Sequence, residues 1–292
     1  MNTERFFEQI MPKVQECGRT ALSIQKGIKQ MTKGNELENQ AKSALTEADL
    51  RVQEEMLKYF LDNGYNFRIF AEEETRFVDQ FPKDGDVTVS LDPIDGTRAY
   101  MNNLPNFCTV IAVYQKGCLD GVLVNTPAFE RAYTATRDGS KSMLWTPDGT
   151  GGFARQEFLY LPKVKDTVLT YNPKKADPDG STAKRLDILR SLGIAVNEID
   201  KKEMTDHSIG INSILRGEIN AYFRTDVPCL DWGPISLLME KAGGAVTDYD
   251  GNRDDIYRYW GRTDGSKESR LPSMIVSGDI ELYRTVVDVL KR

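Results

Sequence analysis

The chain has 292 residues, of which 40% are hydrophobic and 28% are charged, and its net charge is -6. This composition is typical of a globular protein with a large core, built as one unit or as two domains. The acidic balance argues against nucleic acid or an anionic membrane as the main partner, and a single histidine, His207, leaves little material for a histidine-based metal site.

The N-terminal segment lacks the apolar run of a signal peptide, and no stretch is long and apolar enough to span a bilayer. The four cysteines form no CxxC pair and no zinc-type spacing, as is typical of reduced core residues. We therefore expect a cytoplasmic protein with no membrane partner and no nucleic-acid partner.

Two long helices and a set of strands are predicted for the first half of the chain. Apolar residues recur every three or four positions across residues 6–28, which predicts an amphipathic helix. The polar residues 29–44 predict a mobile loop, and residues 46–61 predict a second helix. Short apolar runs joined by tight turns then predict an antiparallel sheet. Its expected strands are residues 66–70, 87–91, 107–114, 118–125 and 131–136.

The pattern changes in the second half. Residues 141–165 are irregular and glycine-rich, and we place a domain boundary there, between an N-terminal α+β domain (1–150) and a C-terminal α/β domain (151–292). Beyond it helices and strands alternate, which favours an α/β arrangement. The expected strands are residues 168–171, 196–199, 219–223, 245–247 and 273–277, and the expected helices are residues 181–192, 206–215, 231–241 and 279–290.

Acidic residues stand at the ends of these predicted elements. Glu72 follows the first strand, and the second strand runs into the sequence LDPIDGT, which contains Asp92 and Asp95. Asp49 and Asp231 lie near the starts of two helices. Carboxylates from separate elements can converge in this way on a divalent cation, and magnesium prefers such hard oxygen ligands.

The LDPIDGT segment can supply both metal ligands and a phosphate site. Pro93 favours a tight turn that aims the two aspartates at one point, with the carbonyl of Ile94 between them. Gly96 and Thr97 then open a short helical segment, whose free backbone N–H groups can hold a phosphate oxygen.

Each piece also has a purely structural interpretation. Asp-Pro-x-Asp-Gly is a common exposed turn, and the acidic run beginning at Glu72 is typical of a solvated surface. Thr46 and Asp49 fit a capping box, and Asp231 fits an N-cap. Taken singly these interpretations are favoured, whereas the four acidic spots together favour a metal site.

With these motifs the chain resembles the inositol monophosphatase family along nearly its whole length. The resemblance is carried by TEAD at 46–49, AEE at 71–73, LDPIDGT at 91–97, and Asp231 followed after 242 − 231 = 11 positions by AGG at 242–244. It implies a layered αβαβα sandwich of the sugar phosphatase type, with an antiparallel N-terminal sheet, two long helices and an α/β C-terminal half. It also implies a magnesium-dependent, lithium-sensitive phosphatase with a small phosphorylated substrate, and it is compatible with a homodimer.

The resemblance further implies roles for individual residues. Two or three magnesium ions would be held by Glu72, Asp92, the carbonyl of Ile94, Asp95 and Asp231. Thr97, paired with Asp49, would orient and deprotonate a metal-bound water. Glu72, the third catalytic candidate, would also help to hold a third, loosely bound ion. The N–H groups of Gly96 and Thr97 would bind the phosphate, and Asp95 and Asp231 would also face the substrate.

Substrate choice is where the chain departs from the family. Inositol-specific members have a glutamate seven residues before the last metal aspartate, and here 231 − 7 = 224 is Arg224. A cation there favours a second anionic group, as in fructose 1,6-bisphosphate or a 3′,5′-bisphosphonucleotide, or else serves in a salt bridge between subunits. His207 either lines the substrate pocket or is structural. The sequence DGTRAY also looks like the histidinol-phosphate phosphatase branch, and a non-catalytic metal-binding scaffold remains the alternative from another class.

Overall fold

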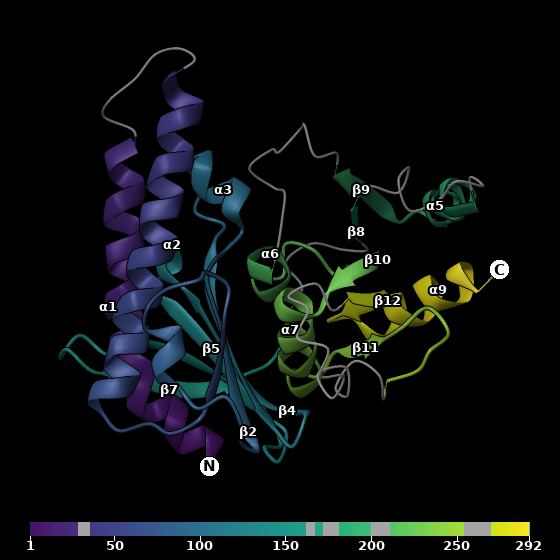
Figure 1. The fold of residues 1–292 in the computed structure, drawn as a ribbon. Coiled ribbons are helices and arrows are strands. Elements are labelled where there is room, and N and C mark those ends of the chain that lie inside the picture. Colours follow the sequence, from purple (N-terminus) through teal and green to yellow (C-terminus); the bar gives the residue numbers. More distant parts are fainter. Residues whose placement is uncertain (29–35, 162–166, 172–180, 200–210, 254–269, 292) are drawn as a thin grey trace. The chain divides into compact units, whose positions relative to one another are not determined.

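The computed structural model describes residues 1–28, 36–161, 167–171, 181–199, 211–253 and 270–291 (Figure 1). These residues form two compact units. The N-terminal unit comprises Met1–Gly139 and Met143–Glu157, and the C-terminal unit comprises Ser140–Ser142 and Phe158–Arg292. The expected division into functional domains at residue 150 stays a prediction.

The N-terminal unit contains a seven-stranded sheet in the order β1-β2-β3-β4-β5-β6-β7. Neighbouring strands from β2 to β6 are antiparallel, as the short turns between them predict. β1 and β2 instead run parallel, because the chain between them is long enough to cross back along the sheet. The strands are β1 Arg68–Ala71, β2 Val87–Asp95, β3 Cys108–Gln115, β4 Cys118–Thr126, β5 Arg131–Thr136, β6 Ser142–Pro147 and β7 Phe153–Phe158.

Helices α1 (Thr3–Ile28) and α2 (Glu36–Asp62) lie side by side and pack against this sheet (Figure 1). Both contribute fully buried side chains at helical spacing, and these form one core with the sheet. The core side chains of the two helices include Phe6, Ile10, Val14, Cys17, Ala21, Ala48, Val52, Met56 and Phe60.

The predicted loop at residues 29–44 is wrong from Glu36 onward, where α2 has already begun. The sequence there lacks an apolar stripe but consists largely of good helix formers, and helix propensity alone does not require amphipathicity. Residues 29–35 lie outside the described residues.

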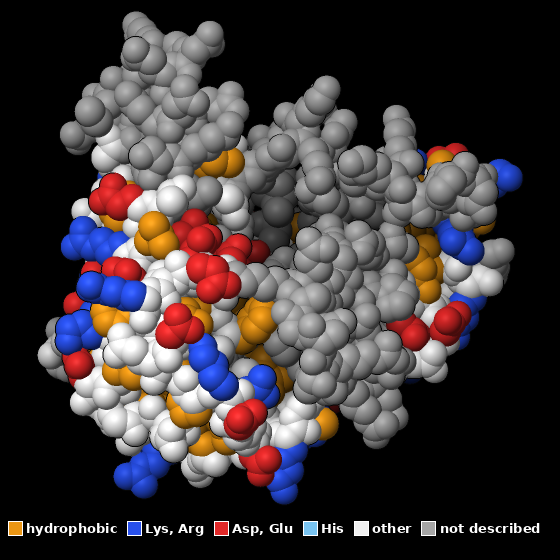
Figure 2. All heavy atoms as spheres, viewed as in Figure 1, with side chains coloured by type: hydrophobic (Ala, Val, Ile, Leu, Met, Phe, Trp, Pro, Cys, Tyr) orange, Lys and Arg blue, Asp and Glu red, His pale blue; other side chains and the backbone are white. Residues whose placement is uncertain are grey.

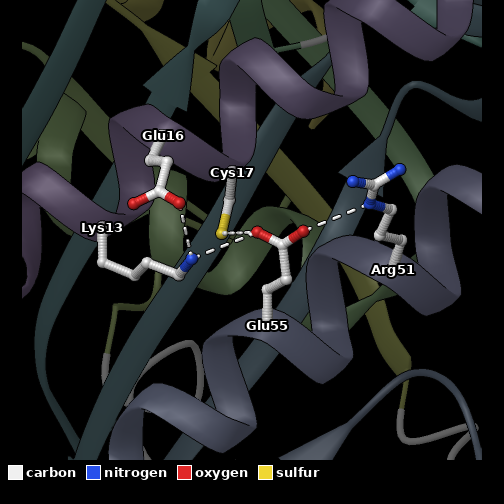
Figure 3. A network of polar contacts seen from close by, with 5 residues as sticks. All are labelled: Lys13, Glu16, Cys17, Arg51 and Glu55. Atoms are coloured by element: carbon white, nitrogen blue, oxygen red, sulfur yellow. Dashed lines mark hydrogen bonds and ion pairs between the residues drawn. The ribbon is translucent and has the colours of Figure 1, made fainter.

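A polar network joins the two helices (Figure 3). One carboxylate oxygen of Glu55 accepts from Lys13 Nζ at 3.1 Å, and the other accepts from Arg51 Nε at 3.2 Å. Lys13 also pairs with Glu16 at 3.0 Å, and the Cys17 thiol lies 3.7 Å from Glu55 Oε2. Burial raises the pKa of the Cys17 thiol to about 12, so the thiol is neutral beside the carboxylate. These contacts hold α2 in place against α1.

Two strands occupy part of the stretch predicted to be irregular. β6 and β7 are joined by a turn in which Asp148 Oδ1 accepts from the N–H groups of Thr150, at 2.8 Å, and Gly152, at 3.0 Å. The sequence reads as irregular because β7, FARQEF, is largely exposed with a polar centre, and a glycine-rich turn separates it from β6.

The C-terminal unit is built on a five-stranded sheet in the order β11-β12-β10-β8-β9. β8, β9 and β10 are parallel, and β12 is antiparallel to β10 and β11. The predicted α/β second half is therefore confirmed. The strands are β8 Thr167–Tyr171, β9 Ala195–Ile199, β10 Ala221–Pro228, β11 Ala245–Thr247 and β12 Arg270–Ser277.

Helices pack on both faces of this second sheet. Ile275 joins the core formed with α5 (Ser181–Ser191) and α9 (Ile280–Leu290). The neighbouring Met274 accepts from Ser236 Oγ on α7 (Cys229–Lys241) at 3.3 Å. Because adjacent residues of a strand point to opposite faces, α7 lies on the other side of the sheet. A short helix, α6 (Ile211–Leu215), contacts α7, and the residues expected to begin it, 206–210, lie outside the described part.

The expected mixture of helices and sheets is confirmed in both units. None of the helices in the described ranges combines the length and apolarity that a bilayer crossing requires. On the face shown in Figure 2, acidic and basic side chains are interspersed over the described residues, and acidic ones gather in one area.

Candidate active site

The parallel pairing of β1 with β2 brings two of the predicted acidic residues to one edge of the sheet. Ala71 lies opposite Leu91 in this pair, and the N–H of Glu72 donates to the Leu91 carbonyl at 3.2 Å. The two strands run in the same direction, and Ala71–Leu91 is their last pair. Glu72 and Asp92 each follow this pair, so they lie next to each other at the carboxyl end of the paired segment. The Glu72 side chain is exposed and that of Asp92 is half-buried.

The tight turn expected at Pro93 is wrong, because β2 continues through Asp95. Asp92 lies opposite Val110, and Asp95 lies opposite Cys108. The two residues between them in β2 therefore face the single residue between them in β3. This irregularity is a β-bulge, which tolerates a proline because the ladder is already interrupted there.

Hydrogen bonds from both strands hold the bulge. The N–H of Ile94 donates to Asp92 Oδ1 at 3.1 Å, and Thr109 Oγ1 donates to the Pro93 carbonyl at 2.9 Å. The side chain of Ile94 is buried, whereas Asp92 is only half-buried. The bulge thus anchors its apolar residue in the core and leaves the neighbouring carboxylate at the surface.

Gly96 follows the bulge and requires the absence of a side chain. Its φ is +91°, and a Cβ at this position would lie 2.8 Å from the Asn106 carbonyl oxygen. Only glycine satisfies both conditions without strain. The expected short helical segment is confirmed as α3 (Thr97–Met101), with the Thr97 side chain exposed at its first position.

Hydrogen bonds to α1 fix the position of helix α3. The Tyr100 hydroxyl donates to the Ala21 carbonyl at 2.7 Å, and Gln25 Nε2 donates to the carbonyls of Tyr100, at 3.1 Å, and Leu104, at 3.0 Å. Because a five-residue helix has no stability of its own, these bonds determine how α3 is oriented. Gln25 was not among the residues predicted from the sequence, where its only signal is a polar residue next to the apolar stripe of the first helix.

Asp49 lies near the middle of α2, and the residue is 8% exposed. Burial, followed by the nearby charges of Glu72 and Glu73, raises the pKa of Asp49 to about 8. The pKa of Tyr100 is also raised, chiefly by burial and further by the charge of Asp49. The α2 helix, the end of β1 and the α3 helix therefore converge around Asp49.

This position overturns one structural interpretation of the sequence. Helix α2 begins at Glu36, ten residues before Thr46 (46 − 36 = 10), so Thr46 and Asp49 cannot form a capping box at its start. A carboxylate buried in the middle of a helix is costly and therefore indicates a specific role.

Gln53 is a second residue that was not predicted from the sequence. Its side chain is fully buried, one helical turn after Asp49. Gln53 Nε2 donates to the Glu73 carbonyl at 2.6 Å, and Gln53 Oε1 accepts from the Glu73 N–H at 2.9 Å. A glutamine within the apolar stripe of α2 was the available sequence signal.

The remaining predicted residues belong to the C-terminal unit. Helix α7 begins at Cys229, so Asp231 is its third residue and not its N-cap. Arg224 lies in β10, in register with Met274 of β12. The side chains of Asp231 and Arg224 lie outside the described part of the structure, as does the whole of His207, so the expected meeting of Asp231 with the other carboxylates stays a prediction.

The donors of the N-terminal unit suit a hard divalent cation by their chemistry. Glu72, Asp92 and Asp95 offer carboxylate oxygens and Ile94 a carbonyl, the ligand types that magnesium prefers. Among the described residues, no three acidic, histidine or cysteine side chains are grouped closely enough to hold an ion. The pKa of Asp49 is raised chiefly by burial and further by the charges of Glu72 and Glu73, and a bound cation would offset only this second, electrostatic part.

Three comparisons relate this chain to known proteins. A profile of the inositol monophosphatase family matches residues 6–275. Inositol monophosphatase 2 of Rattus norvegicus is 25% identical over 249 residues, covering 82% of this chain and 77% of that protein. Nus factor SuhB of Pseudomonas aeruginosa is 25% identical over 230 residues, covering 74% of this chain and 76% of that protein. The solved structure of a Thermotoga maritima IMPase shares the fold, with a TM-score of 0.63 and 17% identity over 100% of this chain and 97% of that one.

Proposed function

This chain belongs to the inositol monophosphatase family, and on that premise we propose that it is a magnesium-dependent phosphatase acting on the phosphomonoester of a small polyol or sugar. The observation that carries the proposal is the convergence around Asp49 of α2, the end of β1 and the α3 helix. These segments contain the motifs expected from the sequence to bind metal and phosphate.

In this proposal the acidic residues at the ends of β1 and β2 bind the metal. Glu72, Asp92, Asp95 and the Ile94 carbonyl would hold two or three magnesium ions together with Asp231 from the C-terminal unit. Magnesium, when bound, supplies positive charge that makes water a better nucleophile and offsets the charge of the phosphate.

The α3 segment and Asp49 would orient the reactants. The N–H groups of Gly96 and Thr97 would bind phosphate oxygens, and the Thr97 hydroxyl would position the attacking water and relay its proton toward Asp49. The position of Asp49 supports this role, because its buried side chain lies near Glu72 and Tyr100 and therefore beside the segments proposed to hold the metal and the phosphate.

The substrate is proposed only as a class. Arg224 in place of the family's glutamate keeps bisphosphates such as fructose 1,6-bisphosphate as the alternative, and the DGTRAY sequence keeps histidinol phosphate. His207 is a candidate for the substrate pocket. Lithium sensitivity, a homodimer and a cytoplasmic location are further expectations of the same proposal.

Phosphate release from a panel of phosphorylated compounds, with and without magnesium, tests the activity. We expect turnover that requires magnesium, and a loss of at least 100-fold in the Asp95→Asn variant, because one metal ligand is removed and the half-buried side chain contributes little packing. Turnover that persists in Asp95→Asn, in a protein with an unchanged circular dichroism spectrum, would contradict the proposal. A preference for bisphosphates that Arg224→Glu abolishes would move the substrate to that class.

A non-catalytic role is the second candidate. The relative in Pseudomonas aeruginosa is named a Nus factor, so family membership alone does not require turnover. Absence of phosphate release over the whole panel, together with intact magnesium binding, would favour this candidate over the phosphatase.

A further inference from the structure

Gln53 joins the centre of α2 to the segment that follows β1. Its side chain is fully buried, and both ends of its amide are bonded to one residue, Glu73. The donor bond to the Glu73 carbonyl is 2.6 Å and the acceptor bond from the Glu73 N–H is 2.9 Å. A side-chain amide is complementary to a backbone peptide group in this way, and a carboxylate or a hydrocarbon is not.

These two bonds restrain the residue beside the predicted metal ligand. Glu73 is fixed by Gln53, and the N–H of Glu72 donates to Leu91 at 3.2 Å. The backbone of Glu72 is thus held on one side by the sheet and on the other by α2, while its side chain is exposed. Asp49 lies on the same helix, four residues before Gln53. The α2 helix therefore positions Asp49 directly and Glu72 through the bonds from Gln53 to Glu73.

We propose that Gln53 is a positioning residue that holds Glu72 in place for a divalent cation. The inference rests on the proposed function and adds a residue to it. Supporting side chains of this kind determine how precisely a ligand is presented, and their loss typically weakens metal binding by 10- to 100-fold. Gln53 itself would touch neither the metal nor the substrate.

The test compares Gln53→Met with the wild-type full chain. Methionine has no amide group, so it removes both hydrogen bonds. Because its volume nearly matches that of glutamine, it keeps the packing of α2. Binding of Mn²⁺ alone is measured by the electron paramagnetic resonance signal of the free ion, and melting temperature is measured in parallel. We expect Mn²⁺ affinity to fall about tenfold. The magnesium concentration that gives half-maximal phosphate release should rise in proportion, with kcat at saturating magnesium within about twofold of wild type.

Asn125→Ala is the matched control. Asn125 is also a fully buried amide of the N-terminal unit, and its Nδ2 donates to the Val14 carbonyl at 3.3 Å, between β4 and α1. This variant should lower the melting temperature and leave Mn²⁺ affinity unchanged. If Gln53→Met does not fold, Gln53→Asn, which is one carbon too short to reach both atoms of Glu73, is measured with the same expectation.

A third variant separates failure of the inference from failure of the proposed function. Glu72→Gln removes the ligand itself and should weaken Mn²⁺ binding. If it does so while the Gln53 variant binds Mn²⁺ like wild type, the positioning role is wrong and the metal site stands. If wild type takes up no Mn²⁺, or Glu72→Gln binds it normally, the proposed metal site is wrong and the positioning role is lost with it.

Discussion

Replacing Asp49 with asparagine should stabilise the metal-free protein at neutral and alkaline pH. The folded state keeps Asp49 protonated up to a pKa of about 8, because burial and the charges of Glu72 and Glu73 disfavour its ionised form. The unfolded chain ionises the same carboxyl near its ordinary pKa of 3.8. Between these two values the unfolded state releases a proton that the folded state retains, so the free energy of unfolding falls as pH rises.

The size of this effect follows from the same two pKa values. At about 1.4 kcal/mol for each tenfold change in proton affinity, the step from 3.8 to about 8 corresponds to on the order of 6 kcal/mol. Asparagine never ionises, so the Asp49→Asn variant avoids this loss. We expect the variant to match wild type near pH 4 and to exceed it progressively up to pH 8, above which the difference becomes constant.

Urea unfolding in the presence of EDTA at several pH values between 4 and 9 measures this difference. Asp138→Asn, which alters an exposed carboxylate of the same unit, serves as the control and should follow wild type. Equal pH dependence of Asp49→Asn and wild type would refute the burial argument. With magnesium present, the same variant should lose phosphatase activity. That result would show that Asp49 lowers the stability of the protein but is needed for its activity.

Three further predictions concern Gly96, Glu55 and Cys17. Gly96→Ala should lower the free energy of unfolding by about 1–3 kcal/mol and abolish phosphate release, because its φ is +91° and the new Cβ would lie 2.8 Å from the Asn106 carbonyl. Gly27→Ala, where a Cβ would meet nothing within 4 Å, is its control, and equal effects of the two substitutions would contradict the steric argument. Glu55→Gln should lower the free energy of unfolding, measured with urea, by only about 1 kcal/mol, because the Lys13–Glu55 ion pair that it weakens is partly exposed. Wild-type Cys17 should resist thiol reagents at pH 8, since its pKa is about 12, and rapid labelling of the folded protein would show that this site is open.

Much of the fold follows from local patterns. The apolar spacing of residues 6–28 and the alternation in the later strands identify elements correctly, because each pattern is a direct consequence of helix or strand geometry. The acidic residues at element ends were likewise visible as candidates. The start of α2 was not, because residues 36–44 form a helix without an apolar stripe to mark it.

Other features depend on partners far away in the chain. The β-bulge between Asp92 and Asp95 arises from pairing with β3, and a proline that suggests a turn by itself is accommodated there within a strand. The bonds of Gln25 to α3 and of Gln53 to Glu73 connect residues separated by 75 and 20 positions, respectively. The sequence by itself determined which residue types are available and which faces of the helices are apolar. Only the tertiary structure decided which buried amide meets which backbone group, because a hydrogen bond depends on distance and direction in space and leaves no periodic trace in the sequence.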